Sequence, residues 1–164
     1  MRKMLRVLLS SLAILTAASA QAEIVARPMT TVSLDVVLGD AQTLASRHPG
    51  MQVLRVEGKS MLPFFGEGSV VVIKKIDGSK LRAGMVAVYH NRFGETVAHR
   101  LVETTTGGWI AKGYNNAEAD STVVNESNLV GVVYATFHSS GRSATPALAS
   151  LALSIPTALA APAR

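Results

Sequence analysis

Short apolar runs alternate with turn residues through the middle of the chain, and this pattern predicts strands. Six runs rich in Val, Ile, Thr and aromatic residues have strand length: Gln52–Glu57, Ser69–Lys75, Met85–His90, Thr96–Glu103, Trp109–Lys112 and Leu129–Phe137. The segments between them contain glycine and other residues that tolerate positive φ. The pattern predicts a mainly β fold, an antiparallel sheet folded into a barrel or coiled sandwich, and does not suit alternating strand and helix units.

The first 22 residues have the features of a secretory signal. Three basic residues among the first six precede an apolar run over 7–17 and a small-residue cleavage site at Ala18-Ser19-Ala20 or Ala20-Gln21-Ala22. The charge-free run 7–22 is shorter than the roughly 20 residues that a spanning helix needs. A cleaved signal is therefore favoured over a retained anchor. We expect an exported protein, either periplasmic or attached to the outer face of the cytoplasmic membrane.

The rest of the chain divides into three parts. Residues 23–50 form a polar lead-in, with a short helix expected over Leu38–Ser46 and a turn at His48-Pro49-Gly50. Residues 51–138 form the β domain. Residues 139–164 form a tail rich in Ala and Pro with an uncharged stretch, for which a flexible tail and a membrane-seeking tail are equal alternatives.

Charge and cysteine content exclude several classes of function. Residues 1–22 carry three of the 16 basic residues and none of the 11 acidic ones, so the formal net charge of +5 falls to +2 without them. This balance does not suit a nucleic-acid-binding protein. The chain has no cysteine, which excludes disulfides, a thiol nucleophile and a thiolate metal site.

A serine follows the first predicted strand in the segment Gly58-Lys59-Ser60-Met61-Leu62-Pro63. A hydroxyl on such a loop can act as a nucleophile, and glycine lets backbone N–H groups approach an oxyanion. The structural alternative is that Ser60 stabilises a turn before proline. Met61, Phe64 and Phe65 are the candidates for a surface that contacts substrate or lipid, with core packing as the alternative.

Two further segments supply groups that could activate this serine. His99 lies within the alternating run Thr96–Val102 and is predicted to share a strand face with Val97 and Leu101. Histidine readily accepts a hydroxyl proton near neutral pH, although a lone inward histidine is often structural.

The loop after Lys112 contains Glu118 and Asp120, and either carboxylate could orient the imidazole of His99. The alternative is that the two carboxylates belong to a solvated turn. Lys74-Lys75 is an alternative base, although paired lysines usually lie on a solvated face. His90 and His138 have no partner at metal-ligand spacing, so neither a metal nor a cofactor is expected.

Five segments, taken in order, resemble the successive sequence boxes of the type I signal peptidase superfamily. They are Gly58–Pro63, Leu81–Val88, Val97–Val102, Lys112–Asn116 and Val130–Val133, and the similarity covers roughly Val53 to Phe137. Many members use a Ser–Lys pair, whereas the endoplasmic-reticulum-type branch has His in place of Lys, as this chain does. The resemblance implies Ser60 as nucleophile with its backbone N–H in the oxyanion hole, His99 as base and Asp120 as the orienting acid.

The resemblance also implies a substrate. It is an exported polypeptide cut after a segment with small residues at the first and third positions before the bond, bound as an added strand beside Ser60. A membrane surface is a second candidate partner.

This chain departs from the pattern of that branch at three positions. Tyr114 and Met85 replace aspartates, and Gly58 stands where a serine often assists the oxyanion hole. One alternative is therefore a degenerate homologue that binds extended peptides without cutting them. Another is a self-processing protein of the repressor type, which the lack of a preceding DNA-binding segment disfavours.

Overall fold

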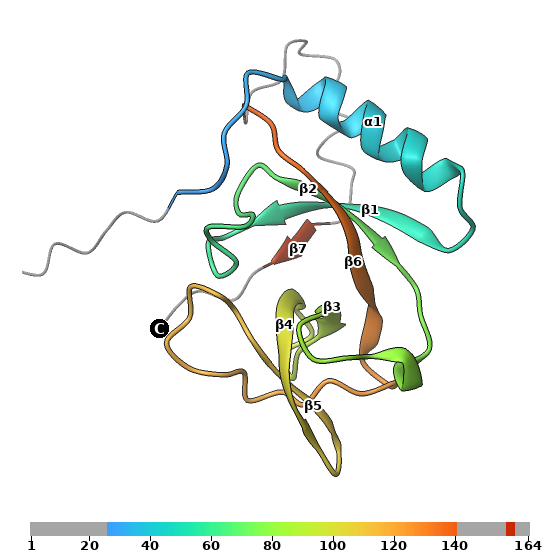
Figure 1. Cartoon of the computed structure of the whole chain (residues 1–164), viewed down its shortest axis with the longest axis vertical. Helices are drawn as coiled ribbons and strands as arrows, with labels where there is room; N and C mark the ends of the chain where they lie inside the picture. Colours follow the sequence, from blue (N-terminus) through green and yellow to red (C-terminus); the bar gives the residue numbers. More distant parts are fainter. Residues whose placement is uncertain (1–25, 141–156, 160–164) are drawn as a thin grey trace, which may run out of the picture.

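The computed structural model describes residues 26–140 and 157–159, which form one sheet with a helix packed on it (Figure 1). The strand order in the described residues is β5-β4-β3-β6-β2-β1-β7. The elements are α1 (Leu34–Ser46), β1 (Met51–Glu57), β2 (Val70–Lys74), the 3-10 turn η1 (Gly78–Lys80), β3 (Val86–His90), β4 (Thr96–Thr105), β5 (Gly108–Lys112), β6 (Leu129–Phe137) and β7 (Thr157–Leu159).

The sheet coils because β6 belongs to both of its halves. The first part of β6 pairs with β3 and the second part pairs with β2, and the register shifts in both ladders. Such irregularities increase local bend and twist. In the strand order β6 separates β1 and β2 from β3 to β5. Figure 1 shows the first pair in the upper part of the view and the other three in the lower part. Every pair of neighbouring described strands is antiparallel except β1 and β7. The predicted mainly β, antiparallel architecture is confirmed.

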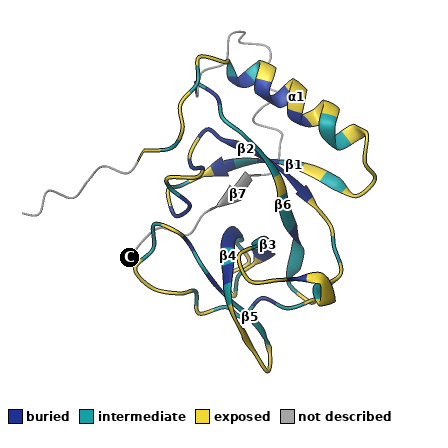
Figure 2. Ribbon diagram, viewed as in Figure 1, coloured by how far each residue is buried: buried dark blue, intermediate teal, exposed yellow. Residues whose placement is uncertain are grey.

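The predicted elements agree with the structure except at their ends. Strand β6 has the predicted bounds, and β1 to β5 differ by one or two residues. The helix was placed too late, because α1 begins at Leu34 and not at Leu38. Leu34, Val37, Leu38 and Ala41 are all buried, and their spacing places one apolar stripe against the sheet (Figure 2).

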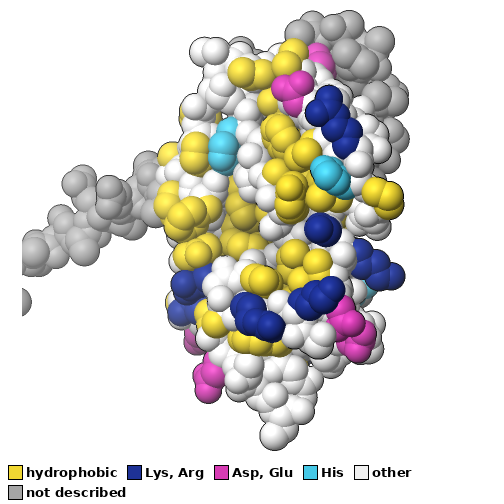
Figure 3. All heavy atoms as spheres, turned by 45° about the vertical axis from the view of Figure 1, so that its right-hand side comes forward, with side chains coloured by type: hydrophobic (Ala, Val, Ile, Leu, Met, Phe, Trp, Pro, Cys, Tyr) yellow, Lys and Arg dark blue, Asp and Glu magenta, His cyan; other side chains and the backbone are white. Residues whose placement is uncertain are grey.

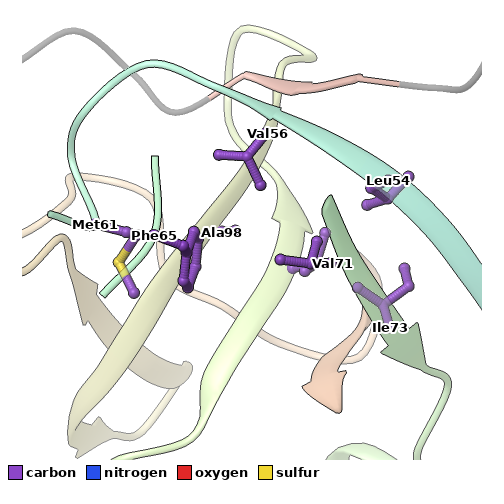
Figure 4. Close-up of a cluster of buried hydrophobic side chains, with 8 residues drawn as sticks. Leu54, Val56, Met61, Phe65, Val71, Ile73 and Ala98 are labelled. Atoms are coloured by element: carbon purple, nitrogen blue, oxygen red, sulfur yellow. The ribbon is translucent and has the colours of Figure 1, made fainter. Parts of the chain in front are cut away.

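Alternation along the strands separates two apolar clusters. Ala87 and Tyr89 of β3 point into one cluster, and Val88 between them points into the other. The second cluster lies inside the coil of the sheet (Figure 4) and consists of Leu54, Val56, Met61, Phe65, Val71, Ile73, Val88 and Ala98. Because β3 is buried on both faces, it is a near-continuous apolar run in the sequence.

The lead-in is tied to the end of β6. The guanidinium of Arg27 donates to the carbonyl of Ser139 (2.8 Å), and the N–H of Ser140 donates to the carbonyl of Val32 (2.8 Å).

On the face of the molecule in Figure 3, apolar side chains lie among basic and acidic ones.

Two sequence predictions fall largely on residues for which no structure is described. The predicted secretory signal lies entirely outside the described residues, as does most of the tail. In the part of the chain that the structure describes, no helix has the length and apolar character to span a bilayer.

Candidate active site

The structure brings Ser60, His99 and Asp120 into one chain of hydrogen bonds. His99 Nε2 lies 2.8 Å from Ser60 Oγ, and His99 Nδ1 lies 2.6 Å from Asp120 Oδ2. A carboxylate accepts hydrogen bonds, so Nδ1 carries the proton and Nε2 is left to accept the hydrogen of the serine hydroxyl. This arrangement suits removal of the Ser60 proton during attack on a carbonyl.

Each member of this chain of hydrogen bonds comes from a different part of the fold. Ser60 begins the turn after β1, His99 lies in the middle of β4, and Asp120 follows β5. The Asp120 N–H donates to the carbonyl of Ala111 on β5 (2.8 Å), which fixes the backbone of the acidic residue. The sheet therefore holds His99 rigidly, while loops supply its two partners.

The predicted orientation of His99 agrees with the packing of β4. Val97 and Leu101, two residues away on either side, belong to the same apolar cluster, whereas the intervening Ala98 belongs to the other. His99 and Ser60 are both 0% exposed in the full chain. A polar pair in such surroundings is stable only when its hydrogen bonds are made, as they are here.

The structure separates the alternative groups from the site. Glu118 is exposed, so it is Asp120 that reaches His99. Lys74 and Lys75 are exposed as well, and the group bonded to Ser60 Oγ is His99. Among the described residues, no group of three or more His, Cys, Asp or Glu side chains could hold a metal ion.

Tyr89 is a member of the network that the sequence did not reveal. Its hydroxyl donates to Asp120 Oδ2, the same oxygen that accepts from His99. Burial, the larger cause, and the hydrogen bond to Asp120, the smaller one, raise the pKa of Tyr89 well above its ordinary value. The phenol therefore remains a donor. Ala87, two residues before Tyr89 on β3, pairs directly with His99 on β4. Tyr89 therefore lies near the site because of the strand register.

The Lys112–Asn116 segment holds the Ser60 loop in place. The N–H of Asn115 donates to the Ser60 carbonyl (2.8 Å), and its side-chain amide donates to the Lys59 carbonyl (3.2 Å). A Cβ on Gly113 would lie 2.7 Å from the Ser60 carbonyl oxygen, closer than real Cβ contacts. Glycine at 113 therefore permits this close contact between two loops.

The three candidates for a surface that contacts substrate, Met61, Phe64 and Phe65, differ in burial. Met61 and Phe65 are buried in the cluster inside the sheet (Figure 4), at 1% and 4% exposure. The turn after Ser60 directs them inward, because the N–H groups of Phe64 and Phe65 both donate to the Met61 carbonyl. Phe64 differs from them, with 51% of its surface exposed.

The structure shows how the three departures from the pattern fit locally. Tyr114 packs on Phe64 (ring centroids 4.2 Å apart), and the Arg100 guanidinium lies 4.4 Å from the Tyr114 ring centre. The tyrosine thus interacts with this arginine through its ring, where a carboxylate would interact by charge. Met85 packs on the cluster containing Tyr89. Gly58 has φ of 83°, a conformation that a serine rarely adopts.

Comparison with known proteins agrees with the geometry of the site. Residues 16–134, most of the chain, match the Peptidase S24-like family. The chain belongs to this family. This S24-like protein is also 35% identical over 85 residues to signal peptidase I W of Bacillus subtilis (strain 168). That match covers 49% of this chain and 45% of the relative, so the chain spans less than half the relative's length. The predicted membership of the signal peptidase superfamily is confirmed.

Proposed function

We propose that this S24-like protein is a serine endopeptidase that cuts exported polypeptides after small residues. The observation that carries the proposal is the chain of hydrogen bonds from Ser60 through His99 to Asp120, at 2.8 and 2.6 Å. A peptidase family implies a polypeptide substrate. The sequence of residues 1–22 supports action outside the cytoplasm, in the periplasm or at the outer face of the cytoplasmic membrane.

In the proposed reaction, Ser60 Oγ attacks the carbonyl carbon of the scissile peptide bond while the hydroxyl proton moves to His99 Nε2. Asp120 stabilises the imidazolium, and the backbone N–H of Ser60 donates to the oxyanion. When the tetrahedral intermediate collapses, the amine leaves with the proton from Nε2. Water then gives its proton to Nε2 and attacks the acyl carbon, which releases the new carboxyl end and restores Ser60.

The proposal is tested by mass spectrometry of a preprotein with an Ala-x-Ala site after incubation with the full chain in detergent. We expect a cut after the second alanine, about 10⁴-fold slower or more in Ser60→Ala and His99→Ala. Lys75→Ala, which replaces an exposed residue of the alternative base pair, is the matched control and should cut at the normal rate.

The rival function is a module that binds extended peptides without cutting them. It was favoured by Tyr114 and Met85, and it requires that Ser60 and His99 be separated or blocked. Their hydrogen bond rules out separation of the two side chains, whereas access to the buried pair is decided by the cleavage assay. A folded protein that binds the preprotein but cuts none of several Ala-x-Ala substrates would make the rival the better account.

A further inference from the structure

The edge of the sheet beside Ser60 is occupied by a segment of the chain's own tail. Strand β7 pairs in parallel with β1, with Arg55 opposite Thr157 and Glu57 opposite Leu159. It also lies against β4, the strand that carries His99. Because β1 and β7 run in the same direction and Ser60 comes three residues after Glu57, β7 is directed toward the Ser60 loop (Figure 1).

The sequence of this tail matches the substrate pattern of the proposed function. Ala158, Leu159 and Ala160 provide small residues at the first and third positions before the Ala160–Ala161 bond. The stretch before them, 147–156, is uncharged and mostly apolar. An apolar run followed by Ala-x-Ala is also the order of residues in the predicted secretory signal.

The site is buried in the chain with its tail in place. Both Ser60 and His99 are 0% exposed, although a nucleophile must be reached by its substrate. β7 pairs with β1, which leads to the Ser60 turn, and lies against β4, which carries His99. An added strand satisfies its backbone groups on the sheet edge, which makes such an edge a natural peptide-binding surface.

We propose that the tail around Thr157–Leu159 is an intramolecular ligand of the active site, bound on the β1 edge where substrates bind. This inference rests on the proposed function and names a regulator of the same site. Substrate then has to displace β7 before it reaches Ser60. Because the tail is part of the same chain, its effective concentration at this edge is on the order of millimolar.

Disulfide trapping tests the docking without relying on catalysis. The chain has no cysteine, so Glu57→Cys with Leu159→Cys, in a Ser60→Ala background that keeps the tail intact, introduces a single pair. Opposed residues in neighbouring strands have Cα atoms about 5 Å apart, within disulfide range. The control pair, Gln52→Cys with Leu159→Cys, uses another exposed β1 position about 17 Å along the strand.

We expect mild oxidation of the dilute full chain to close an intramolecular disulfide in the first pair and not in the control. An added Ala-x-Ala peptide should slow this closure by competing for the edge. Equal closure in both pairs, or none in either, overturns the proposal. A tail found inserted in lipid vesicles, with no closure of the first pair, overturns it in favour of a membrane anchor.

Kinetics test the regulatory consequence. Ala158→Pro removes a backbone donor from β7 and should release the edge. Ala149→Pro, in the same tail but outside β7, is the control. If β7 is docked in about three quarters of molecules, its release lowers the KM of an Ala-x-Ala peptide about fourfold with kcat unchanged. Equal KM values in the two variants overturn the inference. If no variant cuts and the disulfide still closes, the endopeptidase proposal fails and the docking stands.

Discussion

Replacing Tyr89 by Phe removes a hydrogen bond to Asp120 and leaves the ring in place. The hydroxyl donates to the carboxylate oxygen that also orients His99, while the ring packs in a buried apolar cluster. Net contributions of hydrogen bonds to charged groups are about 1.5–3 kcal/mol, so we expect Tyr89→Phe to lower the free energy of unfolding by this amount. Urea denaturation of the full chain measures it.

The same substitution should slow catalysis through the position of Asp120. Without the tyrosine donor, the carboxylate is less firmly held where it orients His99, and we expect kcat to fall about tenfold, or ~1.4 kcal/mol in the barrier. The KM of the peptide should not change, because the Tyr89 hydroxyl is bonded to Asp120 and its ring packs in the core, so its effect on the reaction passes through Asp120. Tyr89 is therefore a positioning residue.

Tyr134→Phe is the matched control because this tyrosine is 54% exposed on β6. We expect its stability to change by less than about 0.5 kcal/mol and its kinetics to be unaltered. If Tyr89→Phe matched this control in both kcat and stability, the hydrogen bond would have no role in positioning Asp120. A higher KM with unchanged kcat would also contradict the reasoning.

Three further outcomes are expected. Asp120→Asn should lower kcat by about 10²–10⁴-fold in a peptide-cleavage assay, because the amide favours the wrong imidazole tautomer of His99. Glu118→Gln, which changes an exposed carboxylate, should leave kcat unaltered. In thermal unfolding, Gly113→Ala should destabilise the fold by about 1–3 kcal/mol, because its Cβ would collide with the Ser60 carbonyl. Gly39→Ala should stabilise the fold by about 0.5–1 kcal/mol, because no atom lies within 4 Å of the added Cβ. Burial and a neighbouring guanidinium charge lower the pKa of His138. Protonation thus favours the unfolded chain, and stability should fall as pH drops through about 6.5, less so in His138→Gln.

The strands could be predicted from sequence because each has a local apolar pattern of strand length, such as the near-continuous apolar runs of β2 and β3. The short ladder of β7 lay beyond this method, since an Ala-rich segment in a tail with three prolines has no strand signal of its own. The start of α1 was missed because its first turn contains two valines, Val36 and Val37, next to a polar lead-in. The burial of Leu34 and Val37 against the sheet outweighs the low helix propensity of valine.

The site was partly predictable for a related reason. Residue chemistry indicated Ser60 and His99, and the choice of Asp120 over Glu118 came from the family resemblance. Tyr89 appeared as one more apolar strand residue, because its partner is 31 positions away in sequence. The inward direction of Met61 and Phe65 depended on the turn after Ser60, whose geometry the letters Met-Leu-Pro-Phe-Phe do not specify.

Trapping the acyl-enzyme tests the central claim most directly. The full chain would be mixed with a peptide ester ending in Ala-x-Ala, quenched in acid and mapped by mass spectrometry. The account predicts one acyl adduct on Ser60 that is absent in Ser60→Ala and strongly reduced in His99→Ala. Peptide cleavage that persists in Ser60→Ala, or an adduct on any other residue, would contradict it.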